Sequence, residues 1–277
     1  MSRFACRLPF YPGKETFTTM RKKMAFRAGI AAAAVCAVVG VTLAVTGTSV
    51  DTTAPASARA DADPKAAKKG EFGSVDCRKA KCIALTFDAG PGEKTPELLD
   101  TLRDEKVPAT FFLLGRKHID RYPETVKRIA DEGHEVASHT WTHRRLTDLS
   151  ADEVREELIR TQRAIAEITG QEPTLMRPPQ GRTDKTVSKV SREVGLSQVL
   201  WSVTAKDYST NDSALIRERV LEQAGKDGII LLHDIYKGTV PAVPGIIDAL
   251  KKRGYTFVTV PQLMAPAVPE PGTVYRP

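Results

Sequence analysis

The chain has 277 residues, of which 41% are hydrophobic, 6% aromatic and 27% charged, a composition typical of a soluble globular body. Its formal net charge of +7 is uneven, because eight of the 41 lysines and arginines but only two of the 34 acidic residues lie in residues 1–60. Residues 61–277 therefore carry 33 basic and 32 acidic side chains. This near-neutral balance argues against nucleic-acid binding.

Residues 1–60 have the features of an export leader. Basic residues at 21–23 and 27 precede an apolar, Ala/Val-rich run at 28–45. Small residues at 56–58 and 58–60 resemble signal-peptidase sites, which favours a cleaved signal peptide. The run of 18 residues is also just long enough to span a bilayer, so an uncleaved signal anchor is the alternative. In both cases we expect an exported protein, secreted or held at the cell surface, whose only membrane contact is this segment.

The cysteines divide between the leader and the body. Cys6 and Cys36 fall in the leader, and only Cys77 and Cys82 remain outside it. Two thiols five positions apart in an oxidising compartment predict a disulfide that closes the loop before the first strand. A metal pair is the alternative, but the spacing without further cysteines is poor for zinc.

Residues 46–76 are rich in Ala, Thr, Asp and Lys, and within them we assign 61–76 as a linker after the leader. The body is expected at 77–264, followed by a proline-rich, extended tail at 265–277. Apolar strand candidates alternate with helix candidates throughout the body. The strands are expected at 82–87, 109–114, 135–138, 173–177, 197–201, 228–232 and 256–260, and the helices at 95–105, 122–132, 150–169, 185–194, 213–225 and 243–252.

Alternation of strands and helices predicts an α/β fold with a parallel sheet and right-handed crossovers. Seven strands in one domain suggest a barrel, although an open doubly wound sheet fits the pattern nearly as well. Polar residues after five different strands favour the barrel, because they converge only at one face of a closed or nearly closed sheet. These residues are Asp88, His139, Arg177, Asp207 and His233.

Each polar residue has a structural alternative when it is considered alone. His139 and His143 are four positions apart, so on a helical turn their Cβ atoms would lie about 5–6 Å apart, which suits one metal ion. For a bare pair with this spacing, two structural histidines near a loop are the more common explanation. Asp88 could instead cap a helix, Arg177 could simply belong to a proline-rich loop, and His233 could be part of a turn. The combination is much more specific than its parts.

In order and spacing, the set resembles the polysaccharide deacetylase family, also called carbohydrate esterase family 4 or the NodB homology domain. The resemblance covers about residues 80–262. The family motifs TFDDG, HSxxH or HTxxH, RxPYG, DxxDW and LxH are matched by TFDAG at 86–90, HTWTH at 139–143, RPPQG at 177–181, TAKDY at 204–208 and LLH at 231–233.

The resemblance implies a distorted (β/α)7 barrel that removes N- or O-acetyl groups from polymers such as chitin, peptidoglycan or xylan. It also implies a divalent metal, usually zinc with cobalt or nickel tolerated. Asp88 would be the general base, and His139 and His143 would bind the metal. His233 would be the general acid that protonates the departing amine, a task that suits a side chain with a pKa near neutral.

Further roles follow from the same resemblance. Asp207 would orient His233 and favour its charged form, and Arg177 would pair with Asp88 and orient it. Gln180 stands where the family has tyrosine, but the backbone N–H that would serve the oxyanion survives this change. Thr204 and Tyr208 replace the first aspartate and the tryptophan of the fourth motif, and Tyr208 remains a large aromatic wall. We expect the substrate pocket to be lined by Tyr208, Leu231 and Trp201.

Ala89 is the serious departure, because the family uses this position for the third protein ligand of the metal and a methyl group does not coordinate. Catalytic zinc usually has three protein ligands and one open position. A carboxylate from elsewhere, Asp88 itself or an extra water would have to replace it.

The sequence thus predicts an exported, metal-dependent N-deacetylase of GlcNAc-type glycans in peptidoglycan or chitin, acting as a monomer. An acetyl-xylan O-esterase and a catalytically impaired glycan-binding pseudoenzyme are the alternatives.

Overall fold

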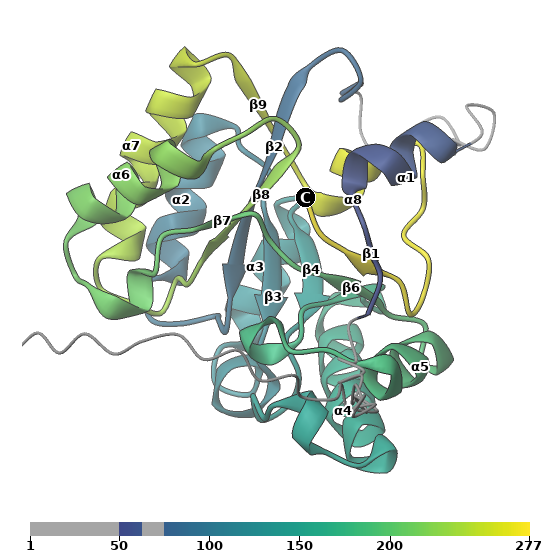
Figure 1. Cartoon of the computed structure of the whole chain (residues 1–277). Helices are drawn as coiled ribbons and strands as arrows, with labels where there is room; N and C mark the ends of the chain where they lie inside the picture. Colours follow the sequence, from purple (N-terminus) through teal and green to yellow (C-terminus); the bar gives the residue numbers. More distant parts are fainter. Residues whose placement is uncertain (1–49, 63–74) are drawn as a thin grey trace, which may run out of the picture. The chain divides into compact units, whose positions relative to one another are not determined.

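The computed structural model describes residues 50–62 and 75–277 (Figure 1). Strands and helices alternate through most of this part of the chain. The strands are β1 (Thr52–Thr53), β2 (Lys81–Asp88), β3 (Thr110–Leu113), β4 (Glu135–Ser138), β5 (Leu175–Met176), β6 (Ser197–Val199), β7 (Val203–Thr204), β8 (Gly228–Leu232), β9 (Tyr255–Val258) and β10 (Val274–Tyr275). The α-helices are α1 (Pro55–Asp61), α2 (Thr95–Glu105), α3 (Pro123–Asp131), α4 (Ala151–Thr169), α5 (Lys185–Glu193), α6 (Ser213–Gln223), α7 (Thr239–Lys252) and α8 (Val260–Met264).

The strands of the described residues form one parallel sheet. Its order is β1-β10-β6-β5-β4-β3-β2-β8-β7, and β9 pairs with the first half of β2. The sheet is curled like a barrel, but its two outermost strands, β1 and β7, do not pair with each other. The barrel is therefore incomplete. All seven expected strands are present at nearly the expected residues, and the prediction of a distorted parallel α/β barrel is confirmed.

Strand periodicity sorts the side chains of β2 onto two faces. Ile83, Leu85 and Phe87 belong to the large apolar cluster that also contains residues of α2, α3, α6 and α7. The intervening Cys82 and Ala84 belong to a second cluster with residues of the other strands and α8. Because successive side chains alternate, Thr86 and Asp88 share the face of this second cluster. The last residue of β2 is thereby directed into the interior of the curled sheet.

Helices cover the outer face of the sheet in the order α6, α7, α2, α3, α4 and α5, each packing against the next. The longest, α4, begins with a capping box, in which the Ser150 hydroxyl accepts the Glu153 N–H and Glu153 accepts the Ser150 N–H, and it ends at Gly170. Both ends were expected from the sequence. Helix α7 begins at Thr239, four residues before the expected start. Pro241 is compatible with this start, because first-turn N–H groups have no helical partner.

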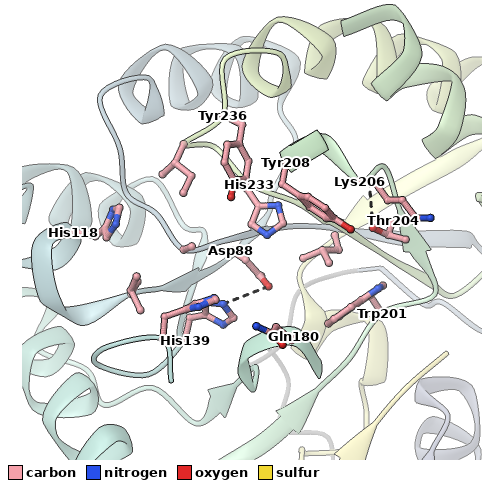
Figure 2. Close-up of a pocket in the computed structure, with 15 residues that line it drawn as sticks. Asp88, His118, His139, Gln180, Trp201, Thr204, Lys206, Tyr208, His233 and Tyr236 are labelled. Carbon is pink, nitrogen blue, oxygen red and sulfur yellow. Dashed lines mark hydrogen bonds and ion pairs between the residues drawn. The ribbon is translucent and has the colours of Figure 1, made fainter. Parts of the chain in front are cut away.

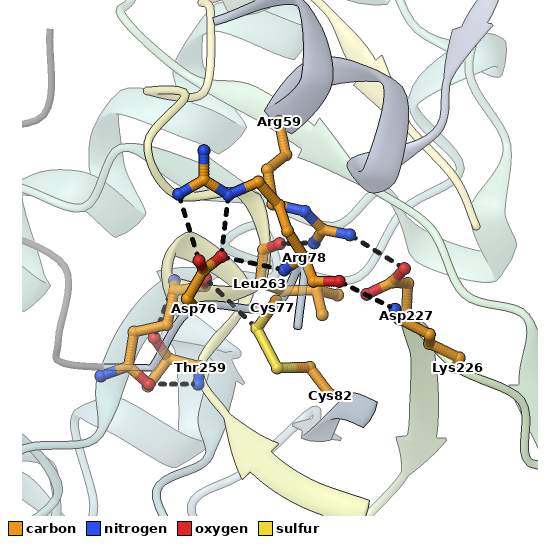
Figure 3. The surroundings of a disulfide bond; sticks show 10 residues. Arg59, Asp76, Cys77, Arg78, Cys82, Lys226, Asp227, Thr259 and Leu263 are labelled. Atoms are coloured by element: carbon orange, nitrogen blue, oxygen red, sulfur yellow. Dashed lines mark hydrogen bonds and ion pairs between the residues drawn. A yellow bond between two sulfur atoms is a disulfide. The ribbon is translucent and has the colours of Figure 1, made fainter. Parts of the chain in front are cut away.

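The ends of the described chain are more ordered than the sequence suggested. Residues 50–62 were placed in the leader and linker, yet β1 pairs with β10 and α1 packs on α8. Arg59 on α1 is buried, and it donates to the Leu263 carbonyl at 2.6 Å and to Asp227 at 2.9 Å (Figure 3). The tail forms β10, which pairs with both β6 and β1. Two-residue strands carry no periodic signal, so the sequence does not reveal them.

Cys77 and Cys82 form a disulfide with their Cα atoms 5.5 Å apart, as predicted (Figure 3). Both residues are fully buried in the cluster that includes Leu263 and Met264 of α8. The disulfide therefore ties the loop before β2 to the start of that strand, within a cluster shared with α8. Within residues 50–62 and 75–277, no helix has both the length and the apolar character needed to cross a bilayer. The apolar run at 28–45 lies outside the described residues.

Candidate active site

The polar residues singled out from the sequence meet at the carboxyl ends of the strands (Figure 2). Asp88 ends β2, His139 follows β4, Arg177 follows β5 and His233 follows β8, while Asp207 opens a short 3-10 turn after β7. They surround or support a cavity of about 700 Å³. Of the expected residues, the cavity wall contains Asp88, His139, His143, Gln180, Trp201, Tyr208, Leu231 and His233.

Asp88 is held by the fully buried guanidinium of Arg177. The Arg177 Nη1 donates to Asp88 Oδ1 at 2.6 Å and to Thr86 Oγ1 at 2.8 Å, while its Nε donates to the Val199 carbonyl at 2.9 Å. The Arg177 guanidinium also lies 4.0 Å from the centre of the Phe112 ring. Burial lowers the pKa of Arg177, and the charge of Asp88 opposes that shift. This charge-assisted pairing fixes one carboxylate in a single orientation at the cavity wall.

His139 and His143 have neighbouring rings, with centroids 4.9 Å apart in an edge-to-face arrangement. Burial lowers the pKa of His139 to about 4, and burial also lowers the pKa of His143. Both imidazoles are therefore neutral at pH 7. His139 Nδ1–H donates to the Arg177 carbonyl at 2.8 Å, so its Nε2 carries the lone pair, 4.0 Å from Asp88 Oδ2. A histidine that binds a metal through one ring nitrogen usually donates the N–H of the other nitrogen to a carbonyl or carboxylate, as His139 does here.

The two histidines do not lie on the helical turn that we considered from their spacing. The segment 139–143 is an irregular loop in which Thr140 and His143 have φ values of 72° and 63°. Hydroxyl groups in and just before this loop hold its backbone. Ser138 Oγ accepts the Thr140 N–H at 3.3 Å, and Thr140 Oγ1 accepts the His143 N–H at 3.1 Å.

Glu157 is a supporting residue that sequence reasoning missed. It lies on α4, is buried, and accepts the backbone N–H groups of Trp141 at 3.0 Å and Thr142 at 2.8 Å as well as the Thr142 hydroxyl. Arg160, one turn later on α4, lies over the Trp141 ring at 4.4 Å. Helix α4 thus positions the loop that presents the two histidines. The sequence does hold one signal for this role, because Glu157 is an acidic residue on the apolar face of an amphipathic helix.

Asp207 and His233 form a second polar pair on the opposite side of the cavity. Asp207 accepts His233 Nδ1–H at 2.8 Å, the His233 N–H at 2.7 Å, the Thr239 hydroxyl at 2.8 Å and the Tyr208 N–H at 3.1 Å. Burial acts to lower the pKa of His233. The hydrogen bond and charge of Asp207, helped by Asp88, outweigh that effect, so the pKa is raised above 6.5. The pair favours the imidazolium form of His233, which lines the cavity.

The remaining expected residues form the walls of the cavity. Tyr208 is 57% exposed, at the rim, whereas Leu231 is buried and Trp201 is partly buried. Gln180 has φ 59°, and its side chain is held by Arg145, whose Nε donates to Gln180 Oε1 at 2.8 Å. The wall also contains residues not singled out from the sequence, notably His118, Lys206, Ile235 and Tyr236.

Ala89 faces the same cavity, and among the residues that the structure describes no other side chain supplies the missing donor. Within residues 50–62 and 75–277, no three His, Cys, Asp or Glu side chains are close enough to hold one ion together. The site therefore offers two neutral imidazoles toward a metal, one fewer protein ligand than a catalytic zinc usually has. These residues do not make a complete catalytic zinc site.

Unusual backbone conformations gather around the cavity. Eight non-glycine residues of the described chain have positive φ. Four of them line the cavity, and a fifth, Thr140, lies in the irregular segment 139–143, which we call the histidine loop. Such strained residues persist where the surrounding structure imposes them, and they cluster at functional sites. The four lining residues are Ala89, His143, Gln180 and Lys206.

Comparison with known proteins agrees with this geometry. Residues 76–199 match the family model described as polysaccharide deacetylase. The peptidoglycan-N-acetylglucosamine deacetylase PgdA of Listeria monocytogenes is 43% identical over 184 residues, which are 66% of this chain and 39% of that protein. The chain thus spans about two fifths of the length of this curated relative.

Two solved structures are informative. One, described as T48 deacetylase with substrate, is 42% identical, with a TM-score of 0.70 over 73% of this chain and 100% of the other. The second is a mutant, with restored enzymatic activity, of a pseudoenzyme of carbohydrate esterase family 4. It is 31% identical, with a TM-score of 0.64 over 67% of this chain and 68% of the other. With the fold, the five motifs and these similarities together, the chain belongs to the polysaccharide deacetylase family, carbohydrate esterase family 4.

Proposed function

We propose that the protein is an exported N-deacetylase that hydrolyses the acetamide of N-acetylglucosamine-type units in a cell-wall glycan. The observation that carries this proposal is the pair of opposed polar groups in one cavity: Asp88 held by Arg177 on one side, and His233 held by Asp207 on the other. Acyl transfer from nitrogen needs a base for the attacking water and an acid for the departing amine, and two groups in contrasting environments meet that need.

Asp88 is proposed as the base. Its Oδ1 is taken by Arg177, while its other oxygen, Oδ2, is the one nearest His139 at 4.0 Å. Water activated there would attack the acetyl carbonyl. The backbone N–H of Gln180, in the wall of the same cavity, is proposed as a donor to the developing oxyanion.

His233 is proposed as the acid. Asp207 accepts a hydrogen bond from Nδ1–H and raises the pKa of the ring above 6.5, which favours a second proton on Nε2 that can pass to the amine as the C–N bond breaks. Hydrolysis of an O-acetyl ester expels an alkoxide, which needs this proton less than an amine does. The Asp207–His233 pair, which favours the imidazolium, therefore suits an amide substrate better. The aromatic rim of Trp201, Tyr208 and Tyr236 would stack against sugar rings.

His139 and His143 are proposed as ligands of a divalent metal, with zinc the first candidate and cobalt or nickel as alternatives. Because the chain supplies only two imidazoles, we expect weak metal binding. The incomplete donor set also supports the second candidate function, a glycan-binding pseudoenzyme. The similarity to a pseudoenzyme of the same family, whose mutant has restored activity, makes that alternative concrete.

Acetate release is the decisive measurement. The purified protein would be assayed on chito-oligosaccharides, peptidoglycan and acetylated xylan, with zinc, cobalt or nickel added, beside the variants Asp88→Asn and His233→Ala. We expect release from an N-acetylated glycan and its loss in both variants. Release from xylan alone would establish the esterase. No release from any substrate, together with retained glycan binding, would establish the pseudoenzyme.

A further inference from the structure

A second cavity adjoins the active-site cavity on the side of His118 and Tyr236, away from Trp201 (Figure 2). Its volume is about 440 Å³. His118, Ile235 and Tyr236 line both cavities, so the two are neighbours that share these three side chains as a wall. We call the second cavity the side groove; its other lining residues are Gly92, Glu93, Lys94, Lys117, Arg121, Tyr122 and Lys237.

The side groove is strongly cationic, although residues 61–277 carry a net charge of only about +1. Four of its lining residues are lysine or arginine, and one is acidic. Lys94 is paired with Glu97 at 2.9 Å, outside the groove. Among the residues that the structure describes, no carboxylate lies within 4.0 Å of Lys117, Arg121 or Lys237. Three exposed cations thus line the side groove without a carboxylate partner among the described residues.

The loop that carries two of these cations is built rigidly into the active-site wall. Residues Gly115–Ile119 of this loop form a kinked turn in which Arg116 and Lys117 have non-helical backbone dihedrals. Lys117 within it has φ 73°, a strained value for a residue with a side chain. His118 Nδ1–H donates to the Pro91 carbonyl at 3.0 Å, and the Arg116 N–H donates to the Trp141 carbonyl at 2.8 Å. These bonds fix the basic loop to the loop after β2 and to the histidine loop.

We propose that the side groove binds carboxylates carried by the glycan while the acetyl group occupies the active-site cavity, so that the preferred substrate is an anionic, muramic acid-containing glycan. Chitin and acetylated xylan have no charge to offer these cations. Peptidoglycan carries the lactyl carboxyl of muramic acid and the carboxylates of its peptides. The inference rests on the proposed function for the identity of the reacting group, but the binding of carboxylate in the groove is independent of turnover.

The experiment compares matched ligands and matched variants. Peptidoglycan fragments are prepared with their carboxylates free or amidated, and a peptide-free fragment separates the lactyl carboxylate from those of the peptide. The test variant is Lys117→Gln/Arg121→Gln/Lys237→Gln. The control variant, Lys79→Gln/Lys185→Gln/Lys189→Gln, removes three exposed lysines that lie outside both cavities. Binding is measured by calorimetry at low and high salt, and KM and kcat wherever acetate is released.

We expect the test variant to weaken binding of the free-carboxylate fragments roughly tenfold, the combined effect of three exposed ion pairs, and to raise KM similarly. High salt should reduce binding by the parent protein in the same direction. Amidated fragments and chito-oligosaccharides should bind both variants alike. Equal affinity of the parent protein for free and amidated fragments would overturn the inference, as would an equal loss for neutral ligands in the test variant. Because calorimetry needs no turnover, a failure of the proposed activity is distinguished from a failure of this inference.

Discussion

At position 89 the backbone conformation and the side chain are poorly matched. Ala89 has φ 61°, in the left-handed region where aspartate and asparagine are enriched among side-chain-bearing residues. An alanine there carries a strain of about 1 kcal/mol. The position also lines the cavity beside His139 and His143. An aspartate would therefore fit the local backbone better than the residue that is present, and its carboxylate would face the same cavity.

Ala89→Asp is expected to tighten binding of zinc to the metal-free protein by on the order of 100-fold, because supporting partners of ligands alone are worth 10–100-fold. Calorimetric titration with zinc measures this directly. Ala89→Asn is the matched control, since it suits the same backbone but provides no anion. Equal affinities of the aspartate and asparagine variants would show that position 89 does not reach the metal.

Asp207 is expected to set the alkaline limit of activity. It raises the pKa of His233, so the charged acid persists to a higher pH than an isolated histidine would allow. In Asp207→Asn the charge is removed while burial still disfavours the imidazolium. The alkaline limb of kcat/KM against pH should then move to lower pH, with a loss of about 10²-fold or more near neutrality. An unmoved limb would assign it to another group.

At the scale of elements, the histidine loop depends on helix α4. The loop has no regular structure of its own, and two of its N–H groups and one hydroxyl are held by Glu157. Because the Glu157 carboxylate is charged and accepts several hydrogen bonds from the loop, it holds the loop in one conformation. The positions of His139 and His143 are therefore set by a residue 14 positions beyond the second histidine.

Glu157→Ala is expected to loosen this loop and to weaken zinc binding by about tenfold or more, as when partners that support ligands are lost. Hydrogen exchange at the amides of Trp141 and Thr142 should accelerate, while the circular dichroism spectrum is unchanged. Glu156→Ala, an exposed neighbour on the same helix, serves as the control. Unchanged exchange at both amides would refute the assignment.

At the scale of the whole molecule, the two ends of the described chain complete the sheet together. Strand β1 pairs with β10, β10 pairs with β6, and the Arg276 N–H donates to the Thr53 carbonyl at 3.0 Å. Arg59 adds a buried ion pair with Asp227, a residue in the loop before β8 (Figure 3). The small-residue segments that resemble cleavage sites lie within α1, which is packed on the body.

A chain that starts at residue 61 is expected to be less stable than one that starts at residue 50. The shorter chain loses β1 and leaves Asp227 without its buried partner, which costs about 3 kcal/mol or more. Urea unfolding at pH 7 measures the difference. Arg59→Met in the longer chain should show a loss of similar size, and adding Asp227→Asn should recover part of it. Equal stability of the two chains would make residues 50–60 dispensable.

The same packing predicts where an N-terminus left by signal processing would lie. If residues 50–62 belong to the folded body, processing should leave them in place, and the N-terminus determined by mass spectrometry should lie before Asp51. A mature protein that begins at Arg59 or Asp61 would contradict this expectation and restore the cleavage sites suggested by the sequence.

The sequence by itself determined the family and the order of the strands along the chain. It also predicted that Asp88, His139, Arg177, Asp207 and His233 share one site, because each stands at the end of a different strand candidate and parallel strands end at one edge. It also predicted the disulfide of Cys77 and Cys82 from their spacing and compartment. Only the tertiary structure decided that the histidine pair lies on an irregular loop held by Glu157, that the side groove shares a wall with the active-site cavity, and that residues 50–62 belong to the fold. These features rest on contacts between residues far apart in the chain and on strands of two residues, and neither leaves a periodic pattern in the sequence.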